Sequence, residues 1–424
     1  MKILFATGKL NSVLSATHKI VYQLAGQLQA NGHQCSVCGF SFDCDENESV
    51  DRGVHVYRWN SPLACDAAQL KFDKYVQQLG ANKRDGARKS FMISHPFSSA
   101  LLALRYSGFV KPAHRAAAYA DRVKKLVLKE KYDAVVAVYM PFDEAMHTAK
   151  ALRGIVPVCL YQADPWGLHR DEKLAKDREL HILQETELFA IADHVITTPA
   201  LYRLYLEHEA YMPFAEKLTP MNFPNIRPSQ QNDAKSVFDF DKDSINLLFC
   251  GLLEDEYRSP QLFLQTAQQL IDEGMPLKIH FLGNSTSKSL VPFMKKYPQN
   301  IIHHQAVSLA QAVATMKAAD FLLNISNTLD NQVPSKIFDY FSLGKPVLNV
   351  QKINNCPSRE YFDRYPLAFT LCDRNPDADK MKAFLLTAKG KTISFETVSE
   401  LFHDATLEYA ADTTEKILAD ILKI

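Results

Sequence analysis

The chain has 424 residues, of which 47% are hydrophobic, and its 48 basic and 48 acidic side chains give a formal net charge of zero. This length allows two or three domains with cores of their own, whereas the balanced charge argues against general nucleic-acid binding, which needs a basic excess. No apolar run approaches the roughly 18 residues that a membrane-spanning helix needs.

The N-terminus and the cysteines indicate a cytoplasmic protein. Residues 1–7 are too short for a signal peptide and are typical of a first strand. Eight cysteines are scattered along the chain, and the one close pair, Cys35 and Cys38, falls in a predicted strand, where residues three apart point to opposite faces. We therefore expect buried, reduced thiols and no metal site.

The chain opens with a strand–loop–helix–strand unit of a doubly wound sheet. A strand over 2–7 leads through a polar loop to a helix that ends at Asn31-Gly32, and a second strand follows. No Gly-x-Gly-x-x-Gly follows the first strand, so the hypothesis of a dinucleotide-cofactor site loses its main support. The loop lies at the carboxyl edge of the sheet, where such folds bind ligands. His18, at the helix start, is a candidate for contact with a ligand, and the alternative is a solvated histidine.

Residues 41–90 look less regular, and the segment 83–131 is strongly basic. It contains 12 Lys and Arg residues against three Asp and Glu residues, and it encloses the apolar runs 91–97 and 100–104. Basic residues beside apolar ones can seat a protein on an anionic membrane face. Two interpretations stay open: peripheral contact with the inner face of a membrane, or helices whose basic side chains are simply exposed.

Buried strands resume at 134–139, 156–161 and 192–198. Asp164 follows the second of these, at a carboxyl end where ligand-contacting residues collect. The alternative for Asp164 is plain Asp-Pro turn chemistry. A polar, proline-containing stretch over 223–233 is typical of a linker, and we place the domain boundary there.

A second series of strands follows the linker, at 245–251, 277–283, 301–304 and 321–326. Two successive α/β series, each with its own core, predict a two-lobed protein. A cleft between two lobes is the natural place for a ligand.

A short helix is predicted between the strands at 321–326 and 346–350. Pro334 suits its first position, and Gly344 suits the left-handed residue that ends a helix. Helical periodicity places two sets of side chains on opposite faces, namely Ile337, Phe338 and Phe341 on one and Ser335, Lys336 and Asp339 on the other.

The polar face of this helix has the chemistry of a nucleotide site. Free N–H groups, a hydroxyl and Lys336 at the helix start can bind an anion. The carboxylate of Asp339, one turn further on, can accept two hydrogen bonds from a diol. Phosphate and ribose together describe a nucleotide, and the alternative is a crossover helix whose polar face is merely solvated.

The block Pro334-Ser335-Lys336-Ile337-Phe338-Asp339-Tyr340, followed by Gly344-Lys345-Pro346-Val347, resembles the donor motif of the nucleotide-sugar-dependent glycosyltransferases of the GT-B architecture, most closely the retaining family 4 (group 1) type. Weaker landmarks match in the right order: Asn31-Gly32-His33, Pro224-Asn225, Gly251 with Arg258, Gly283, and Ala319-Asp320.

The resemblance implies an α/β protein of two Rossmann-like, doubly wound domains that face each other across a cleft. An N-terminal acceptor-binding domain would span 1–225, and a donor-binding domain would span 226–397. The segment 398–424 would be a helix that packs back on the first domain.

The resemblance also implies roles for individual residues. Asp339 would hold the ribose hydroxyls, and Arg258 with Lys336 would grip the diphosphate, so that the reaction needs neither a metal nor a cofactor. The expected donor-binding residues are Gly251, Arg258, Gly283, Asn284, Pro334, Ser335, Lys336 and Asp339. The expected catalytic residues are His18, Asp164 and Asn331.

Two positions depart from the family pattern. The family commonly carries a pair of glutamates eight residues apart, but here Asn331 stands eight residues before Asp339. An amide cannot carry the charge or accept the proton that a carboxylate can. Leu252 and Leu253 follow Gly251 where many relatives carry an arginine.

The function implied is transfer of a sugar, with retention, from a nucleoside diphosphate sugar to a glycan or lipid-linked acceptor in polysaccharide biosynthesis. One alternative is a nucleotide-sugar epimerase of the same fold. Another is a non-catalytic nucleotide-binding subunit, which Asn331 favours. No nucleic-acid partner is expected.

Overall fold

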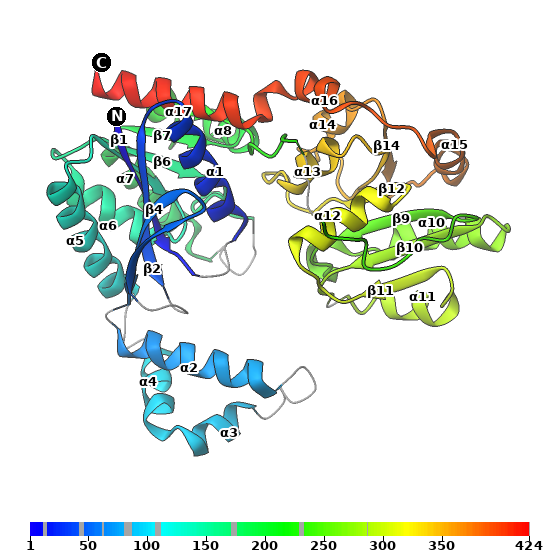
Figure 1. Cartoon of the computed structure of the whole chain (residues 1–424), viewed down its shortest axis with the longest axis horizontal. Coiled ribbons are helices and arrows are strands. Elements are labelled where there is room, and N and C mark those ends of the chain that lie inside the picture. The colour runs from blue at the N-terminus through cyan, green and yellow to red at the C-terminus, as the bar shows by residue number, and fades with distance from the viewer. Residues whose placement is uncertain are drawn as a thin grey trace. The chain divides into compact units, whose positions relative to one another are not determined.

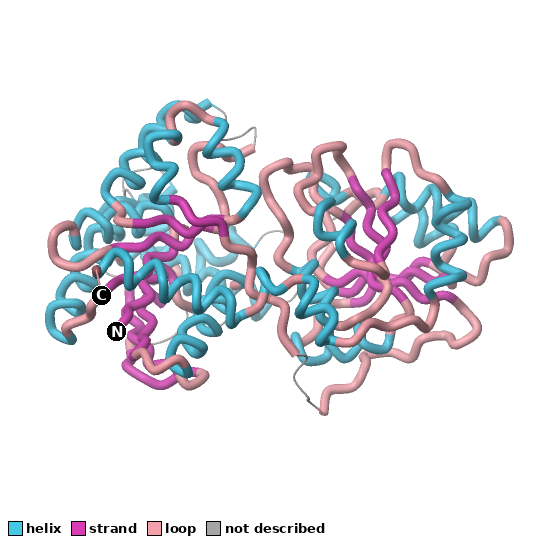
Figure 2. Tube along the Cα trace, turned by 90° about the horizontal axis from the view of Figure 1, so that it is seen from above, coloured by secondary structure: helices cyan, strands magenta, loops and turns pink. Residues whose placement is uncertain are grey.

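The computed structural model describes residues 1–11, 15–41, 46–61, 63–79, 87–106, 112–170, 176–228, 233–285 and 287–423. The chain forms two compact units, the first made of Met1–Asn222 with Ala410–Ile424 and the second of Phe223–Tyr409. Each unit contains a parallel or mostly parallel sheet with its own helices (Figures 1 and 2).

The first unit is built on an eight-stranded sheet in the order β3-β4-β2-β1-β5-β6-β7-β8. Among the described strands of this sheet, only β3 runs antiparallel to its neighbour. Consecutive residues of the central strands are buried on both faces, which requires helices on both sides of the sheet. The strands are β1 (Lys2–Lys9), β2 (Gln34–Ser41), β3 (Asn47–Asp51), β4 (Val54–Asn60), β5 (Ala134–Val138), β6 (Val158–Gln162), β7 (His194–Thr197) and β8 (Leu218–Pro220).

The helices of the first unit include one that returns from the far end of the chain. They are α1 (Ala16–Ala30), α5 (Pro112–Glu130), α6 (Phe142–Leu152), α7 (Arg178–Ile191), α8 (Pro199–Glu207), the 3₁₀ helix η3 (Met212–Lys217) and, from Ala410, α17 (Leu407–Leu422). Glu415 of α17 accepts a hydrogen bond from the side-chain amide of Asn31 at 3.2 Å and lies 3.2 Å from His33 Nε2. These contacts give the Asn31-Gly32-His33 landmark a structural role.

The C-terminal segment differs from the single helix expected over 398–424. Helix α16 (Phe395–Leu401) ends early, and α17 begins only at Leu407. Between them the side chain of Phe402 is buried, and the hydroxyl of Thr406 accepts the backbone N–H of Tyr409 at 3.3 Å. A buried aromatic side chain and a new N-terminal cap therefore interrupt the helix.

Residues 41–90 are more regular than the sequence suggested. They contain β3, β4 and the first of three consecutive helices, α2 (Ala64–Leu79), α3 (Ala87–Ser94) and α4 (Pro96–Tyr106), which lie together in Figure 1. We call these the α2–α4 group. The group has a small core of its own, which consists of Ala68, Phe91 and Leu102 with Phe72, Tyr75 and Leu101 packed against them.

The second unit is built on a six-stranded, all-parallel sheet in the order β11-β10-β9-β12-β13-β14. Its strands are β9 (Ile245–Cys250), β10 (Leu277–Leu282), β11 (Ile301–His304), β12 (Phe321–Ile325), β13 (Val347–Gln351) and β14 (Ala368–Cys372). Its α-helices are α9 (Asp255–Arg258), α10 (Gln261–Asp272), α11 (Leu290–Lys296), α12 (Leu309–Ala318), α13 (Lys336–Ser342), α14 (Arg359–Arg364), α15 (Ala378–Ala388) and α16. None of the helices in the described part of the chain combines the length and apolar character that crossing a membrane requires.

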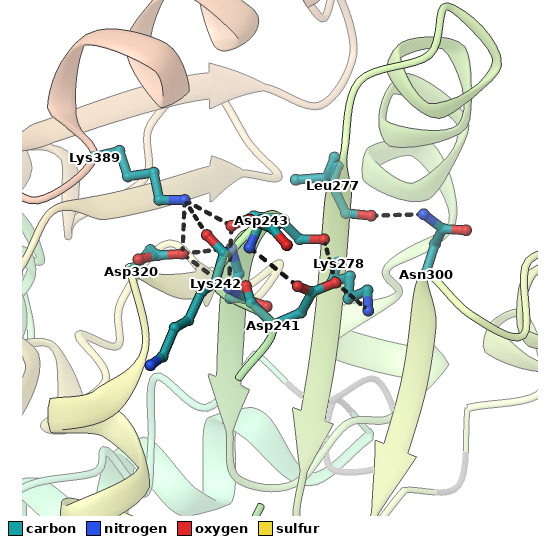
Figure 3. Close-up of polar contacts among 10 residues, drawn as sticks. Asp241, Lys242, Asp243, Leu277, Lys278, Asn300, Asp320 and Lys389 are labelled. Atoms are coloured by element: carbon teal, nitrogen blue, oxygen red, sulfur yellow. Dashed lines mark hydrogen bonds and ion pairs between the residues drawn. The ribbon is translucent and has the colours of Figure 1, made fainter. Parts of the chain in front are cut away.

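A polar network ties together the amino ends of the second unit's strands (Figure 3). Asp320, just before β12, accepts the backbone N–H of Asn246 at 2.9 Å and lies 3.9 Å from the ammonium of Lys389. Lys345, just before β13, donates to the carbonyl of Ala319 at 2.9 Å. Asp320 and Lys345 belong to the motif landmarks, so part of the motif holds the sheet at the edge opposite the strands' carboxyl ends.

A stacked pair of histidines in the second unit is expected to make the stability of that unit depend on pH. His280 Nδ1 lies 3.1 Å from His304 Nε2, and Phe238 stacks on both rings. Burial, together with the charges of His304 and Lys278, lowers the pKa of His280 to about 4. The unfolded chain, with an ordinary histidine pKa near 6.5, therefore binds more protons than the folded protein between about pH 6.5 and 4.

We expect the second unit to lose about 2–3 kcal/mol of stability as the pH falls from 6.5 to 4, with full stability above pH 6.5. Urea unfolding at pH 7.5 and pH 5 would measure the loss. In His280→Gln the pH-dependent part should shrink, since glutamine does not titrate. The same slope in wild type and variant would contradict this account.

Candidate functional site

The helix of the glycosyltransferase-like motif, α13, begins at Lys336, two residues later than expected. The backbone N–H of Ile337 donates to the carbonyl of Pro334 at 3.2 Å, so the chain makes one tight turn before the α-helix starts. The expectation that Pro334 occupies the first helical position is therefore wrong. The polar features at this end of α13 are the side chains of Ser335 and Lys336.

The two faces of α13 are as the periodicity predicted. Ile337, Phe338 and Phe341 are fully buried, whereas Ser335, Lys336 and Asp339 are partly covered. The helix ends at Ser342, and Gly344, the residue after its C-cap, has a left-handed φ of 64°. A Cβ at Gly344 would lie 2.1 Å from the carbonyl oxygen of Ile393, so no other residue fits there.

Lys336 lies against the carboxyl end of β9. Its ammonium is 3.3 Å from the carbonyl oxygen of Cys250 and 4.3 Å from the centroid of the Phe249 ring. A Cβ at Gly251, where φ is 134°, would lie 3.2 Å from the same ammonium. Burial, and secondly the nearby charge of Arg258, lower the pKa of Lys336 to about 7. An anion placed beside it would offset both effects.

Gly283 and Asn284 follow β10, the strand next to β9. A Cβ at Gly283 would lie 2.4 Å from the carbonyl oxygen of Gly251, so the ends of β9 and β10 approach each other too closely for a side chain. The carbonyl of Asn284 accepts the backbone N–H of Leu253 at 3.1 Å, and the residue itself is exposed. The structure thus brings Gly251, Gly283 and Asn284 together at the carboxyl ends of two neighbouring strands.

Arg258 is the second cation at this edge, carried by the short helix α9. Burial lowers its pKa, and the charge of Glu254 offsets part of that effect. Its Nε atom is buried and has no hydrogen-bond partner within the described residues. Arg258 lies near enough to Lys336 for its charge to contribute to the lowered pKa of that lysine, so the two are neighbouring cations at this edge.

Asp255 fixes the position of α9. Its carboxylate accepts hydrogen bonds from the hydroxyls of Ser287 and Ser289 at 2.7 and 2.6 Å. It also accepts the backbone N–H groups of Lys288 and Ser289 at 2.7 and 3.1 Å. Although burial opposes ionisation, these bonds hold the pKa of Asp255 below its usual value. The helix that carries Arg258 is thereby tied to the segment after β10.

Replacing Asp255 with alanine is expected to lower the free energy of unfolding by about 1–3 kcal/mol, because the buried hydroxyl of Ser287 and the partly exposed hydroxyl of Ser289 lose a charged acceptor. Denaturant unfolding would measure the change. The matched control is Glu256→Ala, at an exposed position of the same short helix, which should change stability by less than about 0.5 kcal/mol. Equal effects from both substitutions would contradict the anchoring role.

Asp339 is held by the segment that begins the second unit. The side-chain amide of Asn225 donates to Asp339 Oδ2 at 3.2 Å and to the carbonyl of Ser335 at 3.3 Å. The guanidinium of Arg227 lies 3.7 Å from Asp339 Oδ1. The sequence marked Asn225 only as part of a weak landmark and gave no sign of Arg227. A diol that binds Asp339 would share the carboxylate with both side chains.

Lys352 is a third cation at this edge that the sequence did not single out. It follows β13, and its ammonium pairs with the carboxylate of Asp373, which follows β14. It also donates to the carbonyl of Ser259, next to Arg258, at 3.0 Å. The charge of Lys352 is already paired with Asp373. Its hydrogen bond to Ser259 supports the segment that carries Arg258. Its position directly after a strand is the signal that could have found it.

The three expected catalytic residues are distributed over both units. Asn331 lies between β12 and α13, and its side chain is fully buried. His18, in α1, places its Nδ1 2.7 Å from the hydroxyl of Ser15, which caps that helix, and burial lowers its pKa. Asp164 follows β6 and is exposed. Their catalytic roles stay predictions.

Glu185 holds the loop that carries Asp164. Nothing in the sequence pattern indicated this role of Glu185. This glutamate of α7 is fully buried. Its carboxylate accepts hydrogen bonds from three tyrosine hydroxyls, one side-chain amide and two backbone N–H groups of the loop after β6. The donors are Tyr139, Tyr205, Tyr211, Gln162, Trp166 and Gly167. Glu185 is thus a positioning residue for the loop 163–167, which follows β6.

Among the described residues, no three His, Cys, Asp or Glu side chains are grouped as metal ligands would be. The described cysteines are all free thiols, as the sequence suggested.

The sequence matches no protein-family model, and comparison with curated proteins finds no match. Solved structures do match it. Sucrose-phosphate synthase from Thermosynechococcus elongatus aligns over 100% of this chain and 99% of its own, with a TM-score of 0.63 and 12% identity. The catalytic domain of Starch Synthase IV from Arabidopsis thaliana, bound to ADP and acarbose, aligns over 100% and 99%, with a TM-score of 0.63 and 10% identity.

A UDP-forming alpha,alpha-trehalose-phosphate synthase from Burkholderia vietnamiensis aligns over 100% of both chains, with a TM-score of 0.61 and 10% identity. At such identities the likeness is one of fold. It confirms the expected α/β fold class: this chain has the GT-B fold of these glycosyltransferases.

Proposed function

We propose that this protein is a glycosyltransferase that takes a sugar from a nucleoside diphosphate sugar. The observation that carries the proposal is the pair of neighbouring cations, Lys336 and Arg258, at the carboxyl edge of the second unit's sheet. The pKa of each is lowered in the absence of a bound anion, so a diphosphate would relieve an unfavourable arrangement. That the starch synthase of the same fold was solved with ADP supports the same assignment.

The proposed mechanism uses these cations when the bond between sugar and diphosphate breaks. Negative charge then develops on the β-phosphate, and Lys336 with Arg258 stabilises that charge where it forms. Asp339 accepts hydrogen bonds from the ribose hydroxyls and so orients the donor. Because side chains supply the positive charge, the proposed reaction requires no metal or cofactor.

The finer features of the proposal rest on the resemblance of the motif at 334–347. They are membership of the retaining family 4 type, retention of configuration, and transfer to a glycan or lipid-linked acceptor in polysaccharide assembly. His18, Asp164 and Asn331 are the proposed catalytic residues, and the acceptor is proposed to bind to the first unit.

A thermal-shift screen with UDP, GDP, ADP and their sugar conjugates tests the proposal, since a ligand that binds the folded state raises the melting temperature. We expect one nucleotide to stabilise the protein, and its sugar conjugate to release free nucleotide in the presence of acceptor. No stabilisation by any nucleotide would overturn the proposal.

A second candidate, the non-catalytic nucleotide-binding subunit, is favoured by the buried amide of Asn331. It predicts stabilisation by nucleotide without release of free nucleotide from any conjugate. The epimerase alternative predicts interconversion of the conjugates without an acceptor.

The pKa of Lys336 predicts how nucleotide affinity depends on pH. With a pKa of about 7 in the free protein, the ammonium loses its proton above pH 7, whereas a bound diphosphate favours the protonated form. We therefore expect the affinity for nucleoside diphosphate to fall up to about tenfold per pH unit above 7. Calorimetry from pH 6.5 to 9 would measure it. Lys336→Arg should remove the dependence, because arginine stays charged; an unchanged slope in that variant would refute the assignment.

A further inference from the structure

The corner between α3 and α4 exposes large apolar side chains. Ile93, in the last turn of α3, is 84% exposed, and Phe97, in the first turn of α4, is 77% exposed. These are the two most exposed large apolar side chains within the described residues. Met92 and Leu104 on the same two helices are exposed as well. We call these four side chains the α3–α4 patch.

The exposure of the α3–α4 patch does not result from missing packing between these helices, because the same helices bury other apolar side chains in a core. Phe91, next to Met92, is buried and packs against Phe72 with the ring centroids 5.1 Å apart. The ring of His95 stacks on Phe91 at 4.5 Å, directly between the two helices. The α2–α4 group therefore already has a packed interior, and the exposed side chains of the patch are not part of it.

The sequence around the patch is basic. The three helices of the α2–α4 group contain five Lys and Arg residues against two Asp residues. One of the two, Asp66, is buried and lies 3.8 Å from Arg115, so its charge does not oppose the excess. In the wider basic region 83–131, residues 83–86 and 107–111 lie outside the described residues.

This combination selects one kind of partner. A chain with no net charge carries a basic excess in the sequence of the helices that expose its largest apolar side chains, and an anionic phospholipid surface complements both features. A second copy of the chain would bring the same basic excess against itself. Helices of eight and 11 residues are too short to cross a bilayer and suit its surface instead.

The α2–α4 group is anchored to the carboxyl edge of the first unit's sheet. Helix α2 follows the carboxyl end of β4, and Asp66 in its first turn accepts a hydrogen bond from Ser61. Arg115 joins Asp66 to Glu144 of α6, to which it donates at 2.7 Å. Glu144 packs beside Gly8 near the end of β1, where a Cβ would lie 3.1 Å from the Glu144 Cβ. The patch is thus connected to the edge that carries Asp164.

We propose that the α3–α4 patch seats this protein on an anionic phospholipid bilayer, so that a lipid-anchored acceptor meets the carboxyl edge of the first unit. The part about the acceptor rests on the proposed glycosyltransferase function. The part about the bilayer stands on the exposed side chains and the charge.

Sedimentation of the full-length protein with lipid vesicles tests the proposal. We expect binding to phosphatidylcholine vesicles that contain about 30% phosphatidylglycerol, and roughly tenfold weaker binding to phosphatidylcholine alone. The double variant Ile93→Ser/Phe97→Ser should lose at least about tenfold in partition to the anionic vesicles, since it removes the apolar surface that enters the headgroup region. The matched control is Leu309→Ser/Leu386→Ser, at positions of the second unit that are 57% and 59% exposed, and it should bind as wild type does.

Three results would overturn the inference: no binding to anionic vesicles, equal binding by the double variant, or equal binding to neutral vesicles. Light scattering supplies a further check, because a dimer that the double variant dissociates would show that a second copy covers the patch. Both variants change exposed residues, so equal melting temperatures will confirm that they fold.

The vesicle experiment and the nucleotide experiment test the bilayer contact and the proposed glycosyltransferase function separately. Nucleotide stabilisation is read out by thermal shift without vesicles, and the double variant should retain it. If vesicles bind but no nucleotide does, the glycosyltransferase proposal fails and the bilayer contact stands. If nucleotide binds but vesicles do not, the bilayer contact fails and the glycosyltransferase proposal stands.

Discussion

Replacing Lys336 with alanine is expected to lower the rate of nucleotide release from the donor by about two to three orders of magnitude. The ammonium of Lys336 is the cation of α13, held against the carbonyl of Cys250 and the ring of Phe249 at the end of β9. Its removal leaves Arg258 alone to stabilise charge on the departing diphosphate. A coupled assay for free nucleoside diphosphate, run with donor and acceptor, would measure the loss.

The motif supplies its own control for this experiment. Lys345 lies nine residues further on, but it donates to the carbonyl of Ala319 at the amino edge of the same sheet. Lys345→Ala therefore removes a lysine from the same sequence motif without touching the proposed site. It should lower the melting temperature and leave turnover per folded molecule within about twofold. Undiminished turnover in Lys336→Ala, or equal losses in both variants, would refute the assignment of Lys336.

The part of this site that the sequence predicted is local. The faces of α13 follow from a period of 3.6 residues over seven positions, and the end of the helix follows from the left-handed conformation that Gly344 permits. The start of the helix was misplaced at Pro334 because the fixed φ of proline suits a tight turn, such as the one before Lys336, as well as the first turn of a helix. The grouping of Gly251 and Gly283 was expected from the resemblance, and the reason for it, backbones in near contact, is visible only in space.

The residues that the sequence missed act over long separations. Asn225 and Arg227 reach Asp339 across more than a hundred positions, and no local pattern marks such a pair. The strands and helices within 41–90 were missed for a related reason. The strand β4 gains its regularity from pairing with β2 and β3, and α2 to α4 bury only a small core of their own. Tertiary contacts thus determined the strands and helices in this region, which the local propensity of the sequence did not predict.

Glu185 is the clearest case, because a single glutamate in a helical pattern is ordinarily a surface residue. Replacing it with alanine is expected to destabilise the first unit by about 3–5 kcal/mol. The substitution would leave the hydroxyls of Tyr139, Tyr205 and Tyr211 without the acceptor they share. It would also free the backbone N–H groups of the loop that carries Asp164, and each unsatisfied buried donor costs about 1–3 kcal/mol.

Glu187→Ala, two residues further along α7, is the matched control. Its carboxylate pairs with Lys150 at 2.8 Å on the exposed surface, and such pairs contribute at most about 1 kcal/mol. Thermal unfolding would compare the two variants, and the fluorescence of Trp166, one of two tryptophans in the chain, would report on the loop. Nucleotide stabilisation should survive in Glu185→Ala, since the cations proposed to bind the nucleotide belong to the second unit, which has a core of its own. If Glu185→Ala is as stable as Glu187→Ala, the carboxylate does not hold the loop, and Asp164 loses the rigid support that its proposed role requires.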